Sequence, residues 1–291
     1  MNKNHVPVLL KEAVDLLAVK TDNRYIDATL GGGGHAQEII RQGGQILGID
    51  QDPEAIEFAQ QRVHPTHAQV VLGNFANLES IAQEHGFAPA AGIIFDLGVS
   101  SFQLDTPERG FSFQADAPLD MRMSPDLAVT AADLVNGLGR KELYALFTKL
   151  AQERLARPIA DAIVESRRIN PIKTTQQLAA LVERIYGRRR EHLHPATKVF
   201  QALRIAVNDE LNSLKAALPQ ALNLLRSGSR LIVISFHEGE DRIVKHQFKN
   251  WALDHQGTIL TPKPIIPSSE EIRSNPRSRS AKLRAFEKYE L

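Results

Sequence analysis

Residues 26–36 read Ile-Asp-Ala-Thr-Leu-Gly-Gly-Gly-Gly-His-Ala and are the most informative stretch of the chain. A short apolar run ends in consecutive glycines, and a segment with helical spacing follows them. A second apolar run ends at Asp50, nineteen residues after Gly31. Glycines let the backbone turn sharply and approach a ligand closely, and an acid about twenty residues further on can bind the hydroxyls of a ribose. The stretch therefore predicts a site for an adenosine-containing cofactor.

Two cofactors fit this half of the pattern. The spacing Gly31-x-Gly33-x-x-Ala36 satisfies the dinucleotide fingerprint, so a nicotinamide-dependent oxidoreductase is one interpretation. S-adenosylmethionine is bound by the same succession of strand, glycine loop, helix and acidic strand end, although it has no pyrophosphate. The glycine loop alone does not decide between them.

Short apolar segments alternate with helical ones through the first hundred residues. The pattern predicts strands at 24–29, 45–50, 68–72 and 91–96, with helices at 7–17, 35–42, 53–63 and 76–85. Such alternation is typical of a parallel sheet covered by helices on both faces. The sequence therefore predicts an α/β fold.

The alternation stops after Asp96. A polar, loop-like stretch follows, and residues 130–195 contain helical patterns with no strand candidate. Later segments are predicted as a helix at 197–217, a strand at 230–236, a helix at 241–251 and strand-like pieces near 257–264 and 281–289. We therefore expect a Rossmann-like domain formed by residues 1–105 and 197–291, with an all-helical domain of residues 106–196 inserted into it.

The composition excludes several classes of protein. The chain has no cysteine, which excludes disulfides and thiolate metal sites. It also lacks the nucleophile that methylation at carbon-5 of a pyrimidine usually requires. No apolar run approaches the roughly 20 residues of a membrane span, and the first residues are too charged for a signal peptide. We expect a cytoplasmic protein without a membrane partner.

The overall charge of +1 hides a strong asymmetry. Residues 21–138 carry five Lys and Arg against sixteen Asp and Glu, whereas residues 139–204 carry fourteen against six, a balance of +8. Phosphate neutralisation supplies most of the nonspecific affinity for nucleic acids. The predicted helical domain is therefore a candidate RNA-binding domain, with Arg188, Arg189, Arg190 and Lys198 as candidate contacts.

Polar or aromatic side chains follow the predicted parallel strands at their carboxyl ends, where ligands of such sheets bind. Asp50 is placed to bind the ribose. Phe75 follows the third strand and could stack on an adenine, a contact worth about 1–3 kcal/mol. Asp96 ends the fourth strand, where methyltransferases of this architecture meet both methyl donor and substrate.

Longer strings make the comparison more specific. They are His5-x-Pro7-Val8-Leu9-Leu10-x-Glu12, Asp27-Ala28-Thr29-Leu30-Gly31-Gly32-Gly33-Gly34-His35, Asp96-Leu97-Gly98-Val99-Ser100-Ser101-x-Gln103-Leu104-Asp105, Arg109-Gly110-Phe111-Ser112-Phe113, Pro118-Leu119-Asp120-Met121-Arg122-Met123, His194-Pro195-Ala196-Thr197-Lys198, Ile234-Ser235-Phe236-His237 and Asn275-Pro276-Arg277-Ser278-Arg279-Ser280. In this order the chain resembles the small-subunit ribosomal RNA cytosine-N4 methyltransferase family, the RsmH (formerly MraW) proteins. Small departures occur at Glu238-Gly239 and Ser124, outside the cofactor loop.

The resemblance implies a class I methyltransferase fold with an inserted helical domain. It implies S-adenosylmethionine as methyl donor and, as acceptor, a cytosine in the decoding centre of 16S ribosomal RNA. The small ribosomal subunit is then the partner, and the oligomeric state stays open. The cofactor-binding residues carried over are Gly33, Gly34, His35, Asp50, Phe75, Asp96 and Gln103.

Asp96 is the candidate catalytic residue. The exocyclic N4 of cytosine is a poor nucleophile, so its positioning in line with the methyl group supplies much of the rate. A hydrogen-bond acceptor for the amino group, such as Asp96, helps the nitrogen lose its proton. No metal is expected, because the acidic and histidine residues at 237–246 match no standard zinc spacing.

Two alternatives remain. A nicotinamide-dependent oxidoreductase accounts for residues 31–50 but gives no role to the basic segment or to residues 96–103. A non-catalytic RNA-binding assembly factor accounts for the charge but not for the glycine loop. The sequence alone therefore favours the RNA methyltransferase.

The charge pattern leads to a prediction about RNA affinity. Replacement of Arg188, Arg189 and Arg190 by Ala should weaken RNA binding and flatten its salt dependence, by about one unit of slope for each phosphate that is no longer neutralised. Binding titrations at several salt concentrations measure this slope. Cofactor affinity serves as the control and should not change. An unaltered slope would mean that these arginines are solvated and do not contact RNA phosphates.

Overall fold

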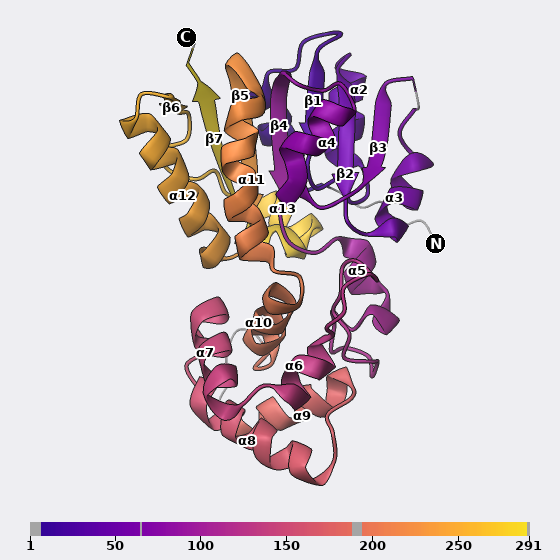
Figure 1. Cartoon of the computed structure of the whole chain (residues 1–291), viewed down its shortest axis with the longest axis vertical. Coiled ribbons are helices and arrows are strands. Elements are labelled where there is room, and N and C mark those ends of the chain that lie inside the picture. The colour runs from indigo at the N-terminus through magenta and orange to yellow at the C-terminus, as the bar shows by residue number, and fades with distance from the viewer. Residues whose placement is uncertain (1–6, 65, 188–193, 290–291) are drawn as a thin grey trace. The chain divides into compact units, whose positions relative to one another are not determined.

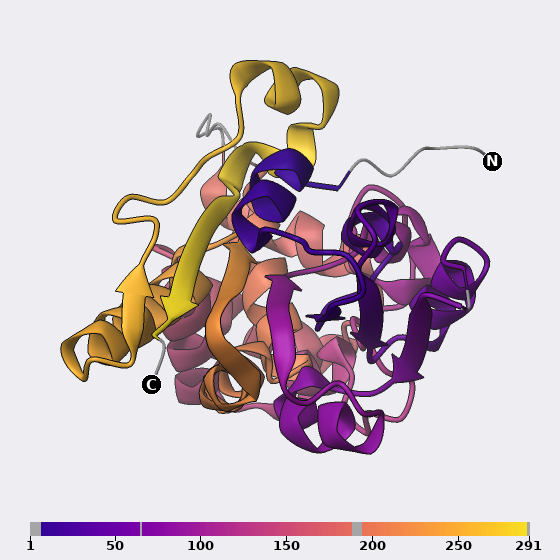
Figure 2. The ribbon, with the colours of Figure 1, turned by 90° about the horizontal axis from the view of Figure 1, so that it is seen from above.

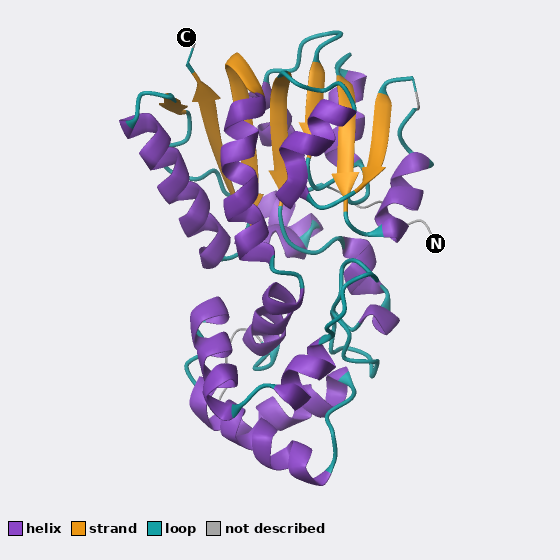
Figure 3. Cartoon of the chain, in the orientation of Figure 1, coloured by secondary structure: helices purple, strands orange, loops and turns teal. Residues whose placement is uncertain are grey.

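The computed structural model describes residues 7–64, 66–187 and 194–289 of the chain. These residues form two compact units. We call the unit within Met1–Gly98 and Leu211–Leu291 the sheet unit, and the unit within Val99–Glu210 the helical unit. Figure 3 shows that the strands gather in the sheet unit, while the helical unit is built of helices and loops.

The described part of the sheet unit contains seven strands in the order β3-β2-β1-β4-β5-β7-β6 (Figure 1). They are β1 (Arg24–Asp27), β2 (Gln45–Asp50), β3 (Ala68–Leu72), β4 (Ala90–Asp96), β5 (Leu225–Ser235), β6 (Gly257–Ile259) and β7 (Lys282–Lys288). Strands β1 to β5 are parallel, and β7 pairs antiparallel with β5 and β6. The carboxyl ends of the parallel strands and the amino end of β7 therefore share one edge.

Two layers of helices cover the sheet. One comprises α1 (Leu10–Leu17), α2 (Gly34–Arg41) and α3 (Pro53–Gln60); the other comprises α4 (Leu78–Glu84), α11 (Glu210–Leu224) and α12 (Glu238–Leu253). Successive strand residues point to opposite faces. Ile93 accordingly packs with the second layer and Ile94 with the first, as do Val233 and Ile232. The predicted α/β fold with helices on both faces is confirmed.

Short helices complete the sheet unit at its connections. They are η1 (Phe75–Asn77), α13 (Ser269–Ser274) and η3 (Pro276–Ser280). The last two precede β7, whose first residue, Lys282, pairs with Ser235 at the end of β5. The C-terminal part of the chain therefore returns to the carboxyl edge of the parallel strands.

The helical unit consists of helices with well-defined starts. They are α5 (Ser101–Asp105), η2 (Pro107–Arg109), α6 (Ala131–Gly137), α7 (Arg140–Ala151), α8 (Ala156–Ile169), α9 (Thr175–Tyr186) and α10 (Thr197–Val207). Ser100, Thr130 and Thr174 cap α5, α6 and α9 by accepting a backbone N–H with the side-chain oxygen, as favoured N-cap residues do. None of the described helices is both long and apolar enough to cross a membrane.

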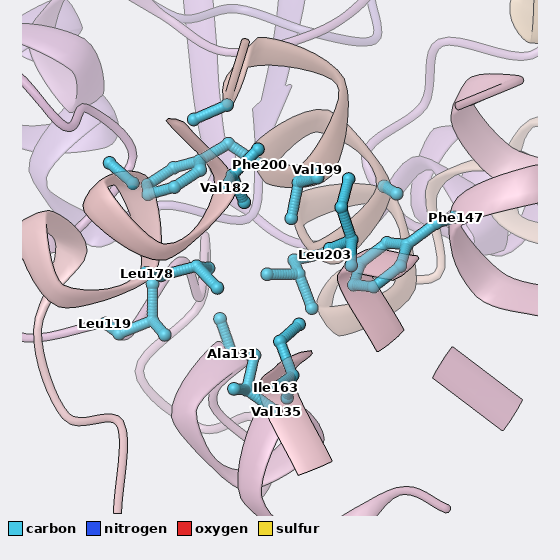
Figure 4. Packing of buried hydrophobic residues seen from close by; sticks show 14 of the residues in the cluster. Leu119, Ala131, Val135, Phe147, Ile163, Leu178, Val182, Val199, Phe200 and Leu203 are labelled. Carbon is cyan, nitrogen blue, oxygen red and sulfur yellow. The ribbon is translucent and has the colours of Figure 1, made fainter. Parts of the chain in front are cut away.

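One hydrophobic cluster holds the helical unit together (Figure 4). Phe147 from α7, Ile163 from α8, Val182 from α9 and Leu203 from α10 are fully buried in it. Burying a large apolar side chain contributes about 1.5–3 kcal/mol relative to leaving it in water. The cluster is separate from those of the sheet unit, so each unit has a core of its own.

The helical unit is longer than the predicted insertion of residues 106–196. It extends over Val99–Glu210, because α10 buries Val199, Phe200 and Leu203 in the helical core. At the other boundary, Val99 and Leu104 pack against the same cluster. The residues that were expected to resume the α/β domain at 197 therefore belong to the helical unit up to α10.

The helix predicted over 197–217 is interrupted. Helix α10 ends at Val207 and α11 begins at Glu210, with Asp209 between them at a φ of 48°. Residues other than glycine adopt this left-handed conformation rarely, so the break is specified by its surroundings. The buried side chain of Asn208 donates to the carbonyl of Met121 and accepts from the amide of Met123.

The strings at 109–113 and 118–123 form a cross-linked loop in the helical unit. Nη2 of Arg109 donates to the carbonyls of Arg122 and Met123, at 3.1 Å and 3.0 Å. Gly110 has a φ of +73°, and a Cβ there would lie 2.3 Å from the carbonyl oxygen of Pro118. These family strings therefore fix the shape of the loop.

Candidate active site

Three aspartates lie at the carboxyl edge of the sheet unit. Asp27 ends β1, Asp50 ends β2 and Asp96 ends β4. Asp27 pairs in register with Gly48 of β2 and with Ile94 of β4, so the three strands end within two residues of one another. Ligands of open parallel sheets bind outside this edge, which makes it the candidate site.

The glycine loop between β1 and α2 is joined to the end of β2. The amide of Gly31 donates to Oδ2 of Asp50 over 2.8 Å. Gly33 has a φ of +72° and precedes the first turn of α2. Gly34 has no room for a side chain, because a Cβ there would lie 2.1 Å from Cγ of Pro7. The loop thus presents bare backbone at the edge.

Residues 7–9, which we call the N-terminal strap, lie against this loop. Besides the contact of Pro7 with Gly34, the carbonyl of Val8 lies 3.2 Å from Nε2 of His35. The amide of Leu9 donates to Oε1 of Glu271 in α13 over 2.8 Å, and Figure 2 shows α13 beside α1. The strap therefore supports the glycine loop from one side and contacts the C-terminal part of the chain on the other.

Asp50 is held by backbone donors and is partly buried. Its carboxylate accepts from the amides of Gly31 at 2.8 Å and Asp52 at 2.9 Å. Burial raises the pKa of Asp50 to about 6, although these backbone hydrogen bonds lower it. Each carboxylate oxygen can accept a second hydrogen bond, so ribose hydroxyls fit this group.

Asp27 and Asp96 repel each other at the centre of the edge. Burial raises the pKa of Asp27 to about 7, and the nearby charge of Asp50 adds to the effect. The pKa of Asp96 is raised well above its ordinary value by burial, then by the charges of Asp27 and Glu240. Opposite charge nearby would reverse these shifts.

Asp96 is fixed through its backbone and has one oxygen without a partner. Its amide donates to Oγ1 of Thr29 over 2.5 Å, and Oδ2 lies 3.7 Å from Nδ1 of His35. Oδ1 is buried and has no hydrogen-bond partner among the described residues. An unpartnered buried acceptor between other carboxyls fits a ligand that brings N–H donors or positive charge.

Phe75 follows β3 at the same edge. It begins η1, where the side chain of Asn74 accepts from the amide of Ala76 and donates to Oε1 of Gln51. The ring of Phe75 meets that of Phe95 edge-on, with centroids 5.6 Å apart. Because an edge-on contact on one side leaves ring surface for another partner, stacking of an adenine on Phe75 is compatible with this position.

The end of β5 adds a second group of polar residues. His237 caps α12, because its Nδ1 accepts from the amides of Gly239 and Glu240. Glu240 is buried and accepts from the amide of Phe236 over 2.8 Å. Behind them, Asp241 and Arg284 form a buried ion pair at 2.6 Å. These contacts hold the segment after β5 in a fixed conformation.

A family model, described as the MraW methylase family, matches residues 2–289 of the chain. The chain belongs to this family. It is 50% identical to ribosomal RNA small subunit methyltransferase H of Thermomicrobium roseum, over 99% of this chain and 94% of that protein. It is 49% identical to the protein of the same name from Dehalococcoides mccartyi, over 98% of this chain and 86% of that protein.

A crystal structure of an rRNA methylase from Streptococcus thermophilus covers 99% of this chain and is covered completely, at 12% identity and a TM-score of 0.47. Membership of the methylase family does not rest on this likeness. The resemblance inferred from the sequence strings is confirmed by the family model and by the relatives. The nicotinamide-dependent oxidoreductase and the non-catalytic assembly factor are thereby disfavoured.

Within this methylase, the sheet unit brings together most of the residues expected to bind the cofactor. Gly33, Gly34, His35, Asp50, Phe75 and Asp96 all belong to its carboxyl edge. Gln103 belongs to the helical unit, where its side chain accepts from the amide of Ser100 in the capping box of α5. It is 4% exposed.

The candidate RNA contacts lie in the basic segment of the methylase. Arg188, Arg189 and Arg190 fall outside the described residues. Lys198 is in α10, and its Nζ donates to the carbonyl of Gln152 at the end of α7 over 3.2 Å. Nearby, Nε2 of His194 lies 2.6 Å from Oε1 of Glu183. In this structure, therefore, the ammonium group of Lys198 contacts another part of the helical unit.

Two contacts of the site are not expected from the sequence of the methylase. Thr29 fixes the amide of Asp96, and Pro7 contacts Gly34. Asp27 is expected only as the end of a strand, and its raised pKa is a finding of the structure. The contacts of Thr29 and Pro7 join distant segments, and no local pattern reveals them.

The raised pKa of Asp27 predicts a dependence of stability on pH. The carboxyl keeps its proton up to about pH 7 when folded, against an ordinary value of 3.8, so the folded protein binds more protons between these values. Its free energy of unfolding therefore falls as pH rises through this window, by up to about 4 kcal/mol for this group. Asp27→Asn should remove that part of the decline.

Urea unfolding of the ligand-free protein at pH 5.5 and pH 8 measures the effect. The control is Asp254→Asn, a change at an exposed position at the end of α12, which should keep the wild-type decline. Equal declines in wild type and Asp27→Asn would contradict the burial of a protonated carboxyl.

Proposed function

We propose that this methylase transfers a methyl group from S-adenosylmethionine to N4 of one cytosine in the decoding centre of 16S ribosomal RNA. The supporting observation is that one buried aspartate, Asp27, and two partly buried ones, Asp50 and Asp96, share a sheet edge with the glycine loop, and all three have raised pKa values. The names of the relatives, ribosomal RNA small subunit methyltransferase H, support the substrate. The enzyme would then work in the cytoplasm with the small ribosomal subunit as partner.

The residues at the edge fit S-adenosylmethionine. When bound, this cofactor supplies a methyl group activated by a positively charged sulfur. Asp50 would hold the ribose hydroxyls, Phe75 the adenine face, and Gly33, Gly34 and His35 the remainder of the donor. Positive charge favours the ionised form of Asp96 and Asp27, so the ligand would relieve their repulsion. Gln103 joins this set through the family resemblance alone.

Asp96 would orient the amino group of the acceptor. The lone pair of the cytosine amino group is delocalised into the ring, so the nitrogen needs to be held in line and helped to lose a proton. Oδ1 of Asp96 is a buried acceptor without a partner among the described residues. An N–H of the amino group could supply the missing hydrogen bond, and proton acceptance by a positioned group contributes typically 10²–10⁴-fold to a rate.

The absence of cysteine agrees with this acceptor. Methylation at carbon-5 of a pyrimidine usually begins with attack of a thiolate on carbon-6, and this chain has no cysteine. Attack by the amino nitrogen itself requires no covalent intermediate with the protein. Among the positions on cytosine, N4 is therefore the one that these residues suit.

The base would reach this edge only after leaving its stack. Enzymes that modify a base inside a folded nucleic acid extrude it into a pocket, at a cost of a few kcal/mol. The net positive charge of residues 139–204 would offset part of that cost by binding the phosphates that flank the target.

The first prediction from this proposal concerns the cofactor. Asp50→Ala should weaken the binding of S-adenosylmethionine tenfold to hundredfold, because hydrogen bonds to a charged partner contribute about 1.5–3 kcal/mol. Calorimetric titration measures the affinity. Asp254→Ala, at an exposed position, is the control and should bind normally, while unchanged affinity in a folded Asp50→Ala variant would remove Asp50 from the site.

The second prediction tests the reaction. Ribosomal subunits incubated with the enzyme and labelled donor should gain one methyl group on N4 of a cytosine, identified by nucleoside mass spectrometry with fragmentation. Asp96→Asn preserves shape but removes the anion, so turnover should fall about 10²-fold, with RNA affinity affected less. A methyl group on carbon-5 or on ribose would contradict the proposed chemistry.

A further inference from the structure

Two buried polar atoms at neighbouring strand ends lack hydrogen-bond partners among the described residues. One is Oδ1 of Asp96, at the end of β4, and the other is Nε2 of His237, just after β5. The two strands are adjacent and parallel, with Asp96 in register with Ile234. Buried polar atoms in folded proteins nearly always have partners, so this pair points to a missing ligand.

The contacts of His237 settle which ring nitrogen carries hydrogen in the neutral side chain. Nδ1 accepts from the amide of Gly239 at 3.1 Å and from that of Glu240 at 3.4 Å. A nitrogen that accepts carries a lone pair, and in a neutral imidazole the other nitrogen is then the N–H donor. Nε2 of His237 is therefore a donor, held in place because the ring also caps α12.

No other group of the described residues satisfies this donor. Oε1 of Glu240 lies 3.2 Å from Nε2, but the two atoms do not meet in hydrogen-bond geometry. The other oxygen of Glu240 accepts from the amides of Phe236 at 2.8 Å and His237 at 3.3 Å. Glu240 therefore orients the backbone of the segment, and its Oε1 lies close to the ring N–H without forming a hydrogen bond to it.

The two unpartnered atoms belong to one neighbourhood of the sheet unit. The charge of Glu240 is one cause of the raised pKa of Asp96, so these carboxyls are close. A Cβ on Gly98 would lie 3.6 Å from the ring of Phe236, so the segments after β4 and β5 also approach each other. The edge thus offers an acceptor at the end of β4 and a donor just after the adjacent strand β5.

This polarity matches the pairing edge of cytosine. Cytosine presents a donor, the N4 amino group, beside an acceptor, N3. Uracil presents the reverse, an acceptor at O4 beside the N3–H donor. A site that forms hydrogen bonds with its substrate discriminates strongly against analogues that leave one of its buried polar groups unpaired.

We propose that His237 is a specificity-determining residue whose Nε2–H donates to N3 of the target cytosine while Oδ1 of Asp96 accepts from N4. This inference rests on the proposed function and adds the group that reads the base. The donor to N3 fixes the ring in its plane, and the amino group is thereby directed to Asp96. Uracil at the same position would face two mismatched hydrogen bonds.

The test combines two substitutions with one altered base. His237→Asn keeps a good N-cap residue but has no group at the place of Nε2, whereas His237→Gln extends an amide N–H toward that place. The substrate is small-subunit RNA, assembled into subunits, with either cytidine or 3-deazacytidine at the methylated position. In 3-deazacytidine a C–H replaces N3.

Wild-type enzyme should methylate the 3-deazacytidine RNA about ten- to hundredfold more slowly than the cytidine RNA. His237→Asn should be slow with cytidine and show no further loss with 3-deazacytidine, because the contact is already absent. His237→Gln should retain part of the wild-type ratio. The matched control is His85→Asn, a histidine outside the carboxyl edge that contacts Gln69, which should keep the full ratio.

The outcomes separate this inference from the proposed function. Equal wild-type rates on the two RNAs would overturn the role of His237, and this measurement needs no variant to fold. A wild-type ratio that persists in His237→Asn would also overturn it. Failure of the wild-type enzyme to methylate the cytidine RNA on N4 would instead overturn the proposed function.

Discussion

Repulsion among closely spaced carboxyls, shielded wholly or partly from water at one edge of the sheet, shapes the site. Asp27 and Asp96 end β1 and β4, and Glu240 lies in the first turn of α12. Besides burial, the charges of Asp27 and Glu240 raise the pKa of Asp96, and the charge of Asp50 raises that of Asp27. The fold tolerates this arrangement because backbone donors, packing and the cap of α12 fix each group separately. A ligand that brings positive charge and N–H donors would lower the cost of ionising these carboxyls. The arrangement therefore favours binding of such a ligand.

Much of the sheet unit could be predicted from the sequence, because its signals are local. Apolar runs that end in Asp27, Asp50 and Asp96 marked three adjacent strands and their order along the chain. The interruption at Asp209 was not predictable, since the helical pattern continues through it and the break depends on Asn208, which bonds residues 121 and 123. The limits of the helical unit were missed for the same reason. The sequence of α10 shows an amphipathic helix but does not show that its apolar face packs with α7 in the helical core.

The residues of the candidate site also differ in whether a local sequence signal reveals them. Its strand-end residues were found because parallel strands bring their carboxyl ends together whatever the detailed packing. The contacts that hold those residues in place were not found. Thr29 bonds the amide of Asp96 and Pro7 packs against Gly34, and each pair is far apart in the sequence. For His237, the sequence shows its position after a strand. Which ring nitrogen donates could be told only from the structure, where Nδ1 accepts hydrogen bonds as the cap of α12.

The contact between the N-terminal strap and Glu271 has a consequence for the order in which the molecule becomes functional during synthesis. The glycine loop is translated long before α13, yet the strap that supports it is bonded to α13. Strand β7, between β5 and β6, is added later still. A nascent chain that ends before residue 271 therefore has the glycine loop and the N-terminal strap but lacks the hydrogen bond that ties the strap to α13.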